Sequence, residues 1–135
     1  PLTYALDHAA EMGIKRAVRL PISIASHSPL MTQAQAQFRM ALDATPFSQP
    51  VLPVVANTTA RPLSTVEEVR AELNAQLTSR VRWTESMQAM IADGVTTFIE
   101  LGSKDVLTGL LKRIDRGVKG YVADSPAGME ALVNP

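Results

Sequence analysis

Two apolar runs, each followed by a segment of helical periodicity, most constrain the fold of this chain. Residues 51–56 read VLPVVA, an almost continuous apolar run that is typical of a central, parallel strand covered on both faces. Residues 95–101 read VTTFIEL and are rich in strand-forming residues. Apolar residues then recur at helical spacing over residues 66–77 and 106–114. This alternation predicts an α/β fold with a mainly parallel sheet that is covered by helices.

Turn and capping residues divide the rest of the chain. Thr3 is expected to begin a first helix that Gly13 ends in a left-handed cap, and residues 64–67 (STVE) predict a capping box for the next long helix. Further helices are expected over residues 84–92, over residues 106–114 with Ser103 as the cap of that helix, and over residues 126–132, with a short strand at residues 119–123.

Residues 17–24 show the strict alternation of a half-buried strand. Pro21 has no N–H to donate to a neighbouring strand, so we expect this strand to lie at the edge of a sheet. Together with the first helix, it suits a smaller, antiparallel subdomain.

A single histidine, His27, follows this strand. Ser28 as N-cap and Pro29 at the first helical position predict a helix directly after it. The positive end of that helix disfavours the imidazolium, so we expect a neutral ring that can accept a proton. Spacing alone leaves two interpretations open, a catalytic base and a polar residue that satisfies the local backbone.

The composition excludes several classes of protein. The formal net charge of the 135 residues is +0, whereas nucleic-acid binding needs a basic excess. There are 0 cysteines, so no disulfide or cysteine–zinc site is expected, which is compatible with a cytoplasmic protein. No apolar run reaches the length of a membrane span. We therefore expect neither a nucleic acid nor a membrane as partner.

Several separated segments, in the same order along the chain, resemble one family. The family is that of the malonyl-CoA:acyl carrier protein transacylases, together with the acyltransferase domains of polyketide synthases. The segments are residues 25–31 (ASHSPLM), 53–57 (PVVAN), 76–77 (QL), 81–86 (VRWTES), 100–102 (ELG) and 106–110 (VLTGL). The resemblance covers most of the chain, as far as Ile114.

The resemblance implies a division of the chain between two subdomains. Residues 1–24 correspond to the end of a ferredoxin-like small subdomain, and residues 25–135 to the C-terminal part of the large α/β acyltransferase subdomain. The family's nucleophilic serine stands in Gly-His-Ser-x-Gly, but none of the 7 glycines here has a serine two positions later. We therefore expect a C-terminal part of the enzyme, inactive alone, that needs the missing N-terminal part as partner and has unpaired strand edges.

The activity that the resemblance implies is transfer of a malonyl group in fatty acid biosynthesis, from coenzyme A to the phosphopantetheine thiol of acyl carrier protein. His27 matches the catalytic histidine, the general base for the serine. Gln76 matches a position whose backbone carbonyl orients that imidazole. Ala25 and Ser26 match positions that vary with the acyl group, and malonyl is the expected one. Asn57, at the carboxyl end of the expected central strand, is a candidate for the substrate pocket or a plain turn residue.

The resemblance implies no cofactor beyond the substrate malonyl-CoA and the phosphopantetheine of the acceptor protein. Two alternatives stay open: the acyltransferase domain of a polyketide synthase, and a non-catalytic scaffold fragment of the same fold. A cluster of basic residues surrounds the C-terminal end of the helix expected over residues 106–114, where positive charge is stabilising. The same cluster is also a candidate docking surface for acidic acyl carrier protein. These residues are Lys112, Arg113, Arg116 and Lys119.

Overall fold

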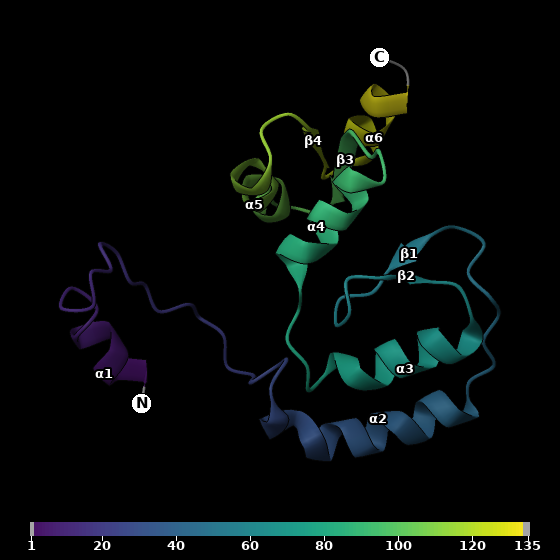
Figure 1. The fold of residues 1–135 in the computed structure, drawn as a ribbon, viewed down its shortest axis with the longest axis horizontal. Coiled ribbons are helices and arrows are strands. Elements are labelled where there is room, and N and C mark those ends of the chain that lie inside the picture. Colours follow the sequence, from purple (N-terminus) through teal and green to yellow (C-terminus); the bar gives the residue numbers. More distant parts are fainter. Residues whose placement is uncertain (1, 134–135) are drawn as a thin grey trace.

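The structure is a computed structural model that describes residues 2–133. Apart from the first helix, its elements form two groups, each with helices and a short two-stranded sheet (Figure 1). The first group lies within residues 29–76 and the second within residues 83–133. Helix α1 (Leu2–Asp7) lies apart from both groups, at the end of a long extended segment (Figure 1). In this part of the chain no helix is long and apolar enough to cross a membrane. In chain order the elements are α1 (Leu2–Asp7), the 3-10 turn η1 (Pro29–Met31), α2 (Thr32–Ala44), β1 (Val54–Val55), β2 (Pro62–Leu63), α3 (Val66–Gln76), α4 (Trp83–Ala92), β3 (Thr97–Leu101), α5 (Val106–Ile114), β4 (Lys119–Ala123) and α6 (Pro126–Val133).

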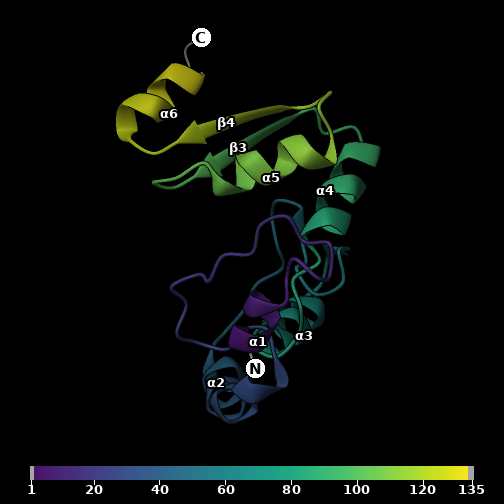
Figure 2. The ribbon, with the colours of Figure 1, turned by 90° about the vertical axis from the view of Figure 1, so that its left-hand side faces the viewer.

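The second group is a parallel strand–helix–strand unit. Strands β3 and β4 pair in parallel, and α5 forms the crossover that lies along them (Figure 2). Helix α5 packs against β4 through Leu111, which is 2% exposed. Gly120 allows this close approach, because a Cβ at that position would lie 2.7 Å from Thr108 Cγ2. The parallel unit expected over the last third of the chain is confirmed.

The N-terminus of α5 is held by a carboxylate from the preceding strand. Glu100 accepts hydrogen bonds from the backbone N–H groups of Leu107 and Thr108, at 3.0 and 2.7 Å, and from the Thr108 hydroxyl. Desolvation acts to raise the pKa of Glu100, but these hydrogen bonds outweigh it and hold the pKa below its ordinary value. The expected cap at Ser103 is wrong: Asp105 is the N-cap residue and Glu100 satisfies the free amides.

The first group is built on the helix pair α2 and α3, which lie side by side (Figure 1). At one end of the pair, the Arg70 guanidinium of α3 donates to the carbonyls of Leu42 and Thr45 at the end of α2. The same guanidinium lies 4.6 Å from the centre of the Phe47 ring. Arg70 therefore caps α2 with a positive charge, where the free carbonyls favour one.

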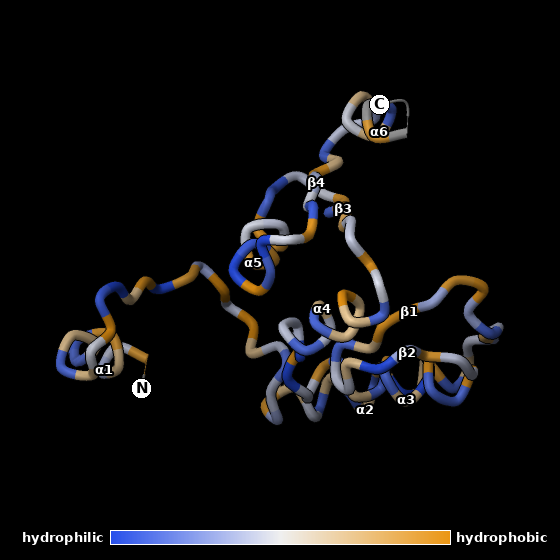
Figure 3. Tube along the Cα trace, turned by 45° about the horizontal axis from the view of Figure 1, so that its top comes forward, coloured by the Kyte–Doolittle hydropathy of each residue, from blue (hydrophilic) through white to orange (hydrophobic). Residues whose placement is uncertain are grey.

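Residues 17–24 do not form the predicted strand. Within the described residues they have no strand beside them, and Val18, Leu20 and Ile22 are each more than 60% exposed. Figure 3 shows hydrophobic and hydrophilic residues alternating along this extended segment before α2. A strand forms only where a neighbour completes its hydrogen bonds, so the pattern alone is not sufficient.

The expected central strand over residues 51–56 is also wrong in extent and direction. Only Val54 and Val55 form a strand, and it pairs with β2 in the antiparallel direction. Val51 and Leu52 are 97% and 75% exposed. No parallel neighbour for this run lies within residues 2–133, which is why it remains largely unpaired.

The accessible surface is large for the mass. It measures 10402 Å², whereas a compact monomer of 14.6 kDa exposes roughly 6,900 Å² by the usual scaling. Exposed apolar side chains contribute to this surface, among them those on the extended segment, on the unpaired run before β1 and on one face of β3. These faces have the composition of buried surface and gain stability when they are covered.

We predict that replacing Thr65 with alanine destabilises α3 by about 1 kcal/mol, because Thr65 forms the capping box with Glu68. The sequence pointed one residue earlier, to a pair between Ser64 and Glu67. Urea denaturation followed by circular dichroism measures the loss, with Glu67→Gln as the matched control on the same turn. Equal losses in the two variants would contradict this assignment of the cap.

Candidate functional site

His27 lies at the tip of a turn immediately before η1. Its φ angle is 62°, the left-handed conformation that histidine tolerates better than most residues with a side chain. Ser28 is the N-cap and Pro29 begins the turn, as predicted, but the Ser28 hydroxyl donates to the carbonyl of Ala25, at 2.8 Å, and not to a helix amide. The side chain of His27 is exposed, and Ala25 and Ser26 lie exposed on the same turn.

The C-terminal end of α3 holds this turn through two hydrogen bonds. The backbone N–H of His27 donates to the carbonyl of Leu77 at 2.9 Å. The ring nitrogen Nδ1 of His27 lies 2.8 Å from the carbonyl oxygen of Gln76. Both carbonyls belong to the last turn of a helix, where no further helical N–H is available to them.

This contact defines the tautomer of the neutral ring. A carbonyl oxygen accepts hydrogen bonds and has no proton to give, so Nδ1 of His27 carries the proton. The lone pair is then on Nε2, the nitrogen on the far side of the ring from Gln76. A fixed ring with a free lone pair is the geometry that a general base needs.

The left-handed backbone of His27 is a feature of the candidate site that the sequence did not predict. A side-chain-bearing residue in this conformation costs about 1–2 kcal/mol, which the surrounding contacts must offset. The two hydrogen bonds to Gln76 and Leu77 are such contacts. Strain that is held in place by long-range contacts is common where a side chain must be aimed.

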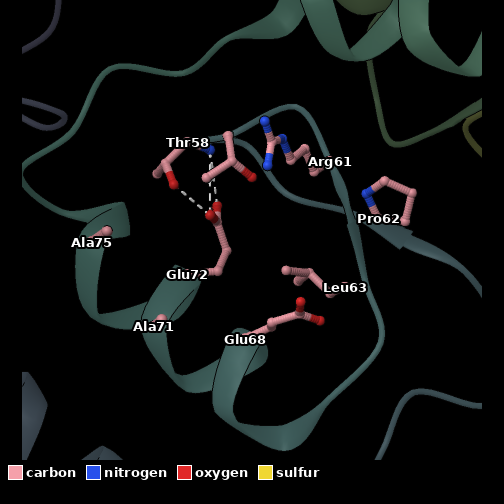
Figure 4. Close-up of a pocket in the computed structure, with 9 residues that line it drawn as sticks. Thr58, Arg61, Pro62, Leu63, Glu68, Ala71, Glu72 and Ala75 are labelled. Carbon is pink, nitrogen blue, oxygen red and sulfur yellow. Dashed lines mark hydrogen bonds between the residues drawn. The ribbon is translucent and has the colours of Figure 1, made fainter.

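Asn57, the candidate residue for the substrate pocket, lies in the loop after β1. Its backbone N–H donates to Glu72 of α3 at 2.8 Å, and its carbonyl accepts from the N–H of Arg82 at 2.7 Å. The N–H and hydroxyl of Thr58 also donate to Glu72, at 3.1 and 2.5 Å. Figure 4 shows the Glu72 carboxylate reaching from α3 to Thr58. Glu72 thereby fixes the loop that carries Asn57.

Two of the grooves beside α3 differ in the residues that line them. Asn57 and Gln76 line the same groove, with a volume of about 390 Å³, next to apolar residues of the β1 region. The groove in Figure 4 lies between α3 and the loop that contains Arg61, and its walls include Glu68 and Glu72. His27 lines neither groove. The carbonyl of Gln76 thus contacts His27, and Gln76 and Asn57 line the same groove.

No protein-family model matches the chain. Among curated proteins, it is 37% identical over 129 residues to the malonyl CoA-acyl carrier protein transacylase of Bacillus subtilis (strain 168), which covers 96% of this chain and 41% of that protein. It is 37% identical over 121 residues to the transacylase of Escherichia coli (strain K12), covering 90% of this chain and 39% of that protein. The chain therefore spans about two fifths of the length of these relatives.

Solved structures match the fold over nearly the whole chain. A crystal structure of malonyl-CoA:acyl carrier protein transacylase from Xanthomonas oryzae is 35% identical with a TM-score of 0.90, covering 98% of this chain and 42% of that one. A malonyl-transacylase in complex with a type II polyketide synthase acyl-carrier protein is 34% identical with a TM-score of 0.89, covering 99% of this chain and 44% of that one. The chain has the α/β fold of the corresponding part of these structures.

We predict that Glu72→Ala frees the loop that contains Asn57 and Thr58, because it removes the acceptor of both backbone N–H groups. Amide hydrogen exchange at these two residues should then quicken strongly while exchange in α2 stays unchanged. Glu67→Ala, an exposed carboxylate of the same helix, is the control and should leave both amides protected. Protection that persists in Glu72→Ala would show that other contacts hold the loop.

Proposed function

We propose that this chain, which is homologous to part of the malonyl-CoA:acyl carrier protein transacylases, supplies the general base of a malonyl transferase. His27 is that base, and it serves a nucleophilic serine that lies outside these 135 residues. The complete enzyme is this chain together with the segment that carries the serine. This chain alone is inactive in transfer, since it holds the base without the nucleophile.

One observation carries the proposal: the 2.8 Å contact between His27 Nδ1 and the Gln76 carbonyl. Resemblance to the family pointed to a backbone carbonyl at Gln76 as the group that orients the imidazole. In the structure these two residues, 49 positions apart in the sequence, are hydrogen-bonded. A scaffold fragment without a catalytic role has no need of a histidine held in one tautomer and in a left-handed backbone conformation, so the geometry favours the catalytic interpretation.

The proposed reaction proceeds in two half-reactions. In the first, His27 Nε2 takes the serine proton as the serine oxygen attacks the thioester carbonyl of malonyl-CoA, and the imidazolium then returns that proton to the departing coenzyme A thiolate. In the second, Nε2 takes the proton of the phosphopantetheine thiol as its sulfur attacks the malonyl-serine ester. The proton is then given to the serine oxygen as the ester bond breaks.

The proposed acceptor is an acyl carrier protein, and a basic surface on α5 supports it. Lys112, Arg113 and Arg116 surround a hollow at the C-terminal end of this helix, together with Gly109 and Val118. Within residues 2–133 no carboxylate lies within 4.0 Å of these three basic groups. Free positive charges of this kind speed the encounter with an acidic partner.

The acyl carrier protein of a polyketide pathway is the second candidate acceptor. It is supported by the solved complex of a malonyl-transacylase with a type II polyketide synthase acyl-carrier protein. It is also supported by 38% identity over 119 residues to the polyketide biosynthesis protein ThaF of Burkholderia thailandensis, covering 86% of this chain and 10% of that protein. Both pathways require the same proton transfers to and from His27.

We predict that His27→Ala in the complete enzyme slows acylation by malonyl-CoA by about 10²–10⁴-fold, the usual contribution of a general base. The rate is measured as transfer of radioactive malonyl groups to protein. His8→Ala is the matched control, because His8, the other histidine of the chain, packs against Tyr4 in α1, at a ring distance of 4.0 Å. Near-normal acylation in His27→Ala would refute the role of this residue as base.

We predict that Lys112→Glu with Arg116→Glu lowers the transfer rate to acyl carrier protein by about 10-fold at low salt, because charge reversal removes electrostatic attraction. The deficit should shrink as salt screens the charges. Transfer to a small uncharged thiol serves as the control and should be unchanged. An unaltered rate to acyl carrier protein at low salt would exclude this surface as the docking site.

A further inference from the structure

The last turn of α3 is held by a side chain of α2 as well as by His27. The amide nitrogen Nε2 of Gln35 donates to the carbonyl of Asn74 at 2.5 Å and to the Thr78 hydroxyl at 3.1 Å. Both partners flank the two carbonyls that bind His27. Gln35 is partly buried between the helices, in the first part of α2.

These contacts close a ring of bonds around the histidine. The backbone runs from His27 through η1 to Gln35, and the Gln35 side chain then binds the helix end that includes Gln76. From Gln76 the ring returns to His27 through the Nδ1 hydrogen bond. A displacement of the end of α3 relative to the start of α2 therefore changes the geometry of the bond that fixes the imidazole.

We propose that Gln35 is a positioning residue for the proposed reaction: it holds the Gln76 carbonyl at the distance that keeps the proton of His27 on Nδ1 and the lone pair on Nε2. This inference rests on the proposed function of His27 as base. Gln35 touches neither His27 nor a reacting atom, so it acts through the position of Gln76.

The opposite end of the same helix pair provides a control. Arg70 joins α3 to the carbonyls of Leu42 and Thr45, so it also binds α2 to α3 by side-chain-to-backbone hydrogen bonds. These bonds lie at the end of α2 away from His27. Substitution of either Gln35 or Arg70 is expected to weaken the packing of α2 on α3. Only substitution of Gln35 is expected to change the tautomer of the His27 imidazole.

The test compares Gln35→Met with Arg70→Met in the complete enzyme. Methionine keeps approximately the length of the Gln35 side chain and the apolar stem of Arg70, and it removes the hydrogen-bond donors of each. Gln35→Glu is a second variant of the same shape, in which the ionised carboxylate cannot donate to Asn74. Two quantities are measured: the ¹⁵N chemical shifts of the His27 ring nitrogens, which report the tautomer, and the rate of acylation by malonyl-CoA.

We expect both Gln35 variants to convert the Nδ1–H form of His27 into a mixture of tautomers, and to slow acylation by about 10- to 100-fold, as small misplacements of catalytic groups do. Arg70→Met should keep the wild-type tautomer and acylation rate even where it lowers the unfolding midpoint. A wild-type tautomer in Gln35→Met and Gln35→Glu, at any acylation rate, would overturn the inference. A tautomer change in an enzyme whose wild type transfers no malonyl groups would instead refute the proposed function and leave the positioning role standing.

Discussion

The bond between the His27 turn and the last turn of α3 is the interaction on which the site depends. It joins two segments that are far apart in the sequence, and it uses helix carbonyls that have no partner within their own helix. These hydrogen bonds hold His27 in a left-handed backbone conformation and select one tautomer of its ring. The side chain of residue 76 plays no part in this. A backbone carbonyl performs the orienting task that a carboxylate performs in other histidine-based sites.

Side-chain carboxylates fix the elements around the site in a similar way. Glu72 of α3 holds the loop that carries Asn57, and Glu100 of β3 satisfies the first amides of α5. In each case a carboxylate accepts two or more hydrogen bonds from another element, which positions a loop or helix end more strictly than apolar contact does. Around these fixed points the apolar surface is large: the extended segment before α2 and the run before β1 are exposed, although their composition is that of buried strands. The geometry of the site thus rests on polar contacts that are complete within the chain, whereas much of the apolar packing is open.

The sequence predicted best where the structure depends on neighbours in the chain. The strand–helix–strand unit from β3 to β4 was predicted because its strands, its crossover and its turns are all local. The strand expected over residues 17–24 is absent and the one expected over residues 51–56 is reduced to Val54 and Val55, since alternation or a continuous apolar run reports a capacity for burial and not the presence of a partner strand. The position of Gln76 came from family resemblance alone, because a backbone acceptor leaves no signature in residue type. The left-handed backbone of His27 and the contact from Gln35 depend on long-range geometry, and no local pattern signals them. The division at residue 24 into a ferredoxin-like part and an acyltransferase part remains a prediction.

In the proposed enzyme, this chain contributes the base for malonyl transfer and another segment contributes the nucleophile. The most direct test is to treat the complete enzyme with malonyl-CoA, trap the malonyl-enzyme, and locate the malonyl group by mass spectrometry of its peptides. The malonyl group is expected on a serine outside these 135 residues, and it should be absent from that serine in His27→Ala at short reaction times. A malonyl group on any residue of this chain, including Ser26 or Ser28 beside the histidine, would show that the nucleophile lies in this chain and would refute the proposed division of roles.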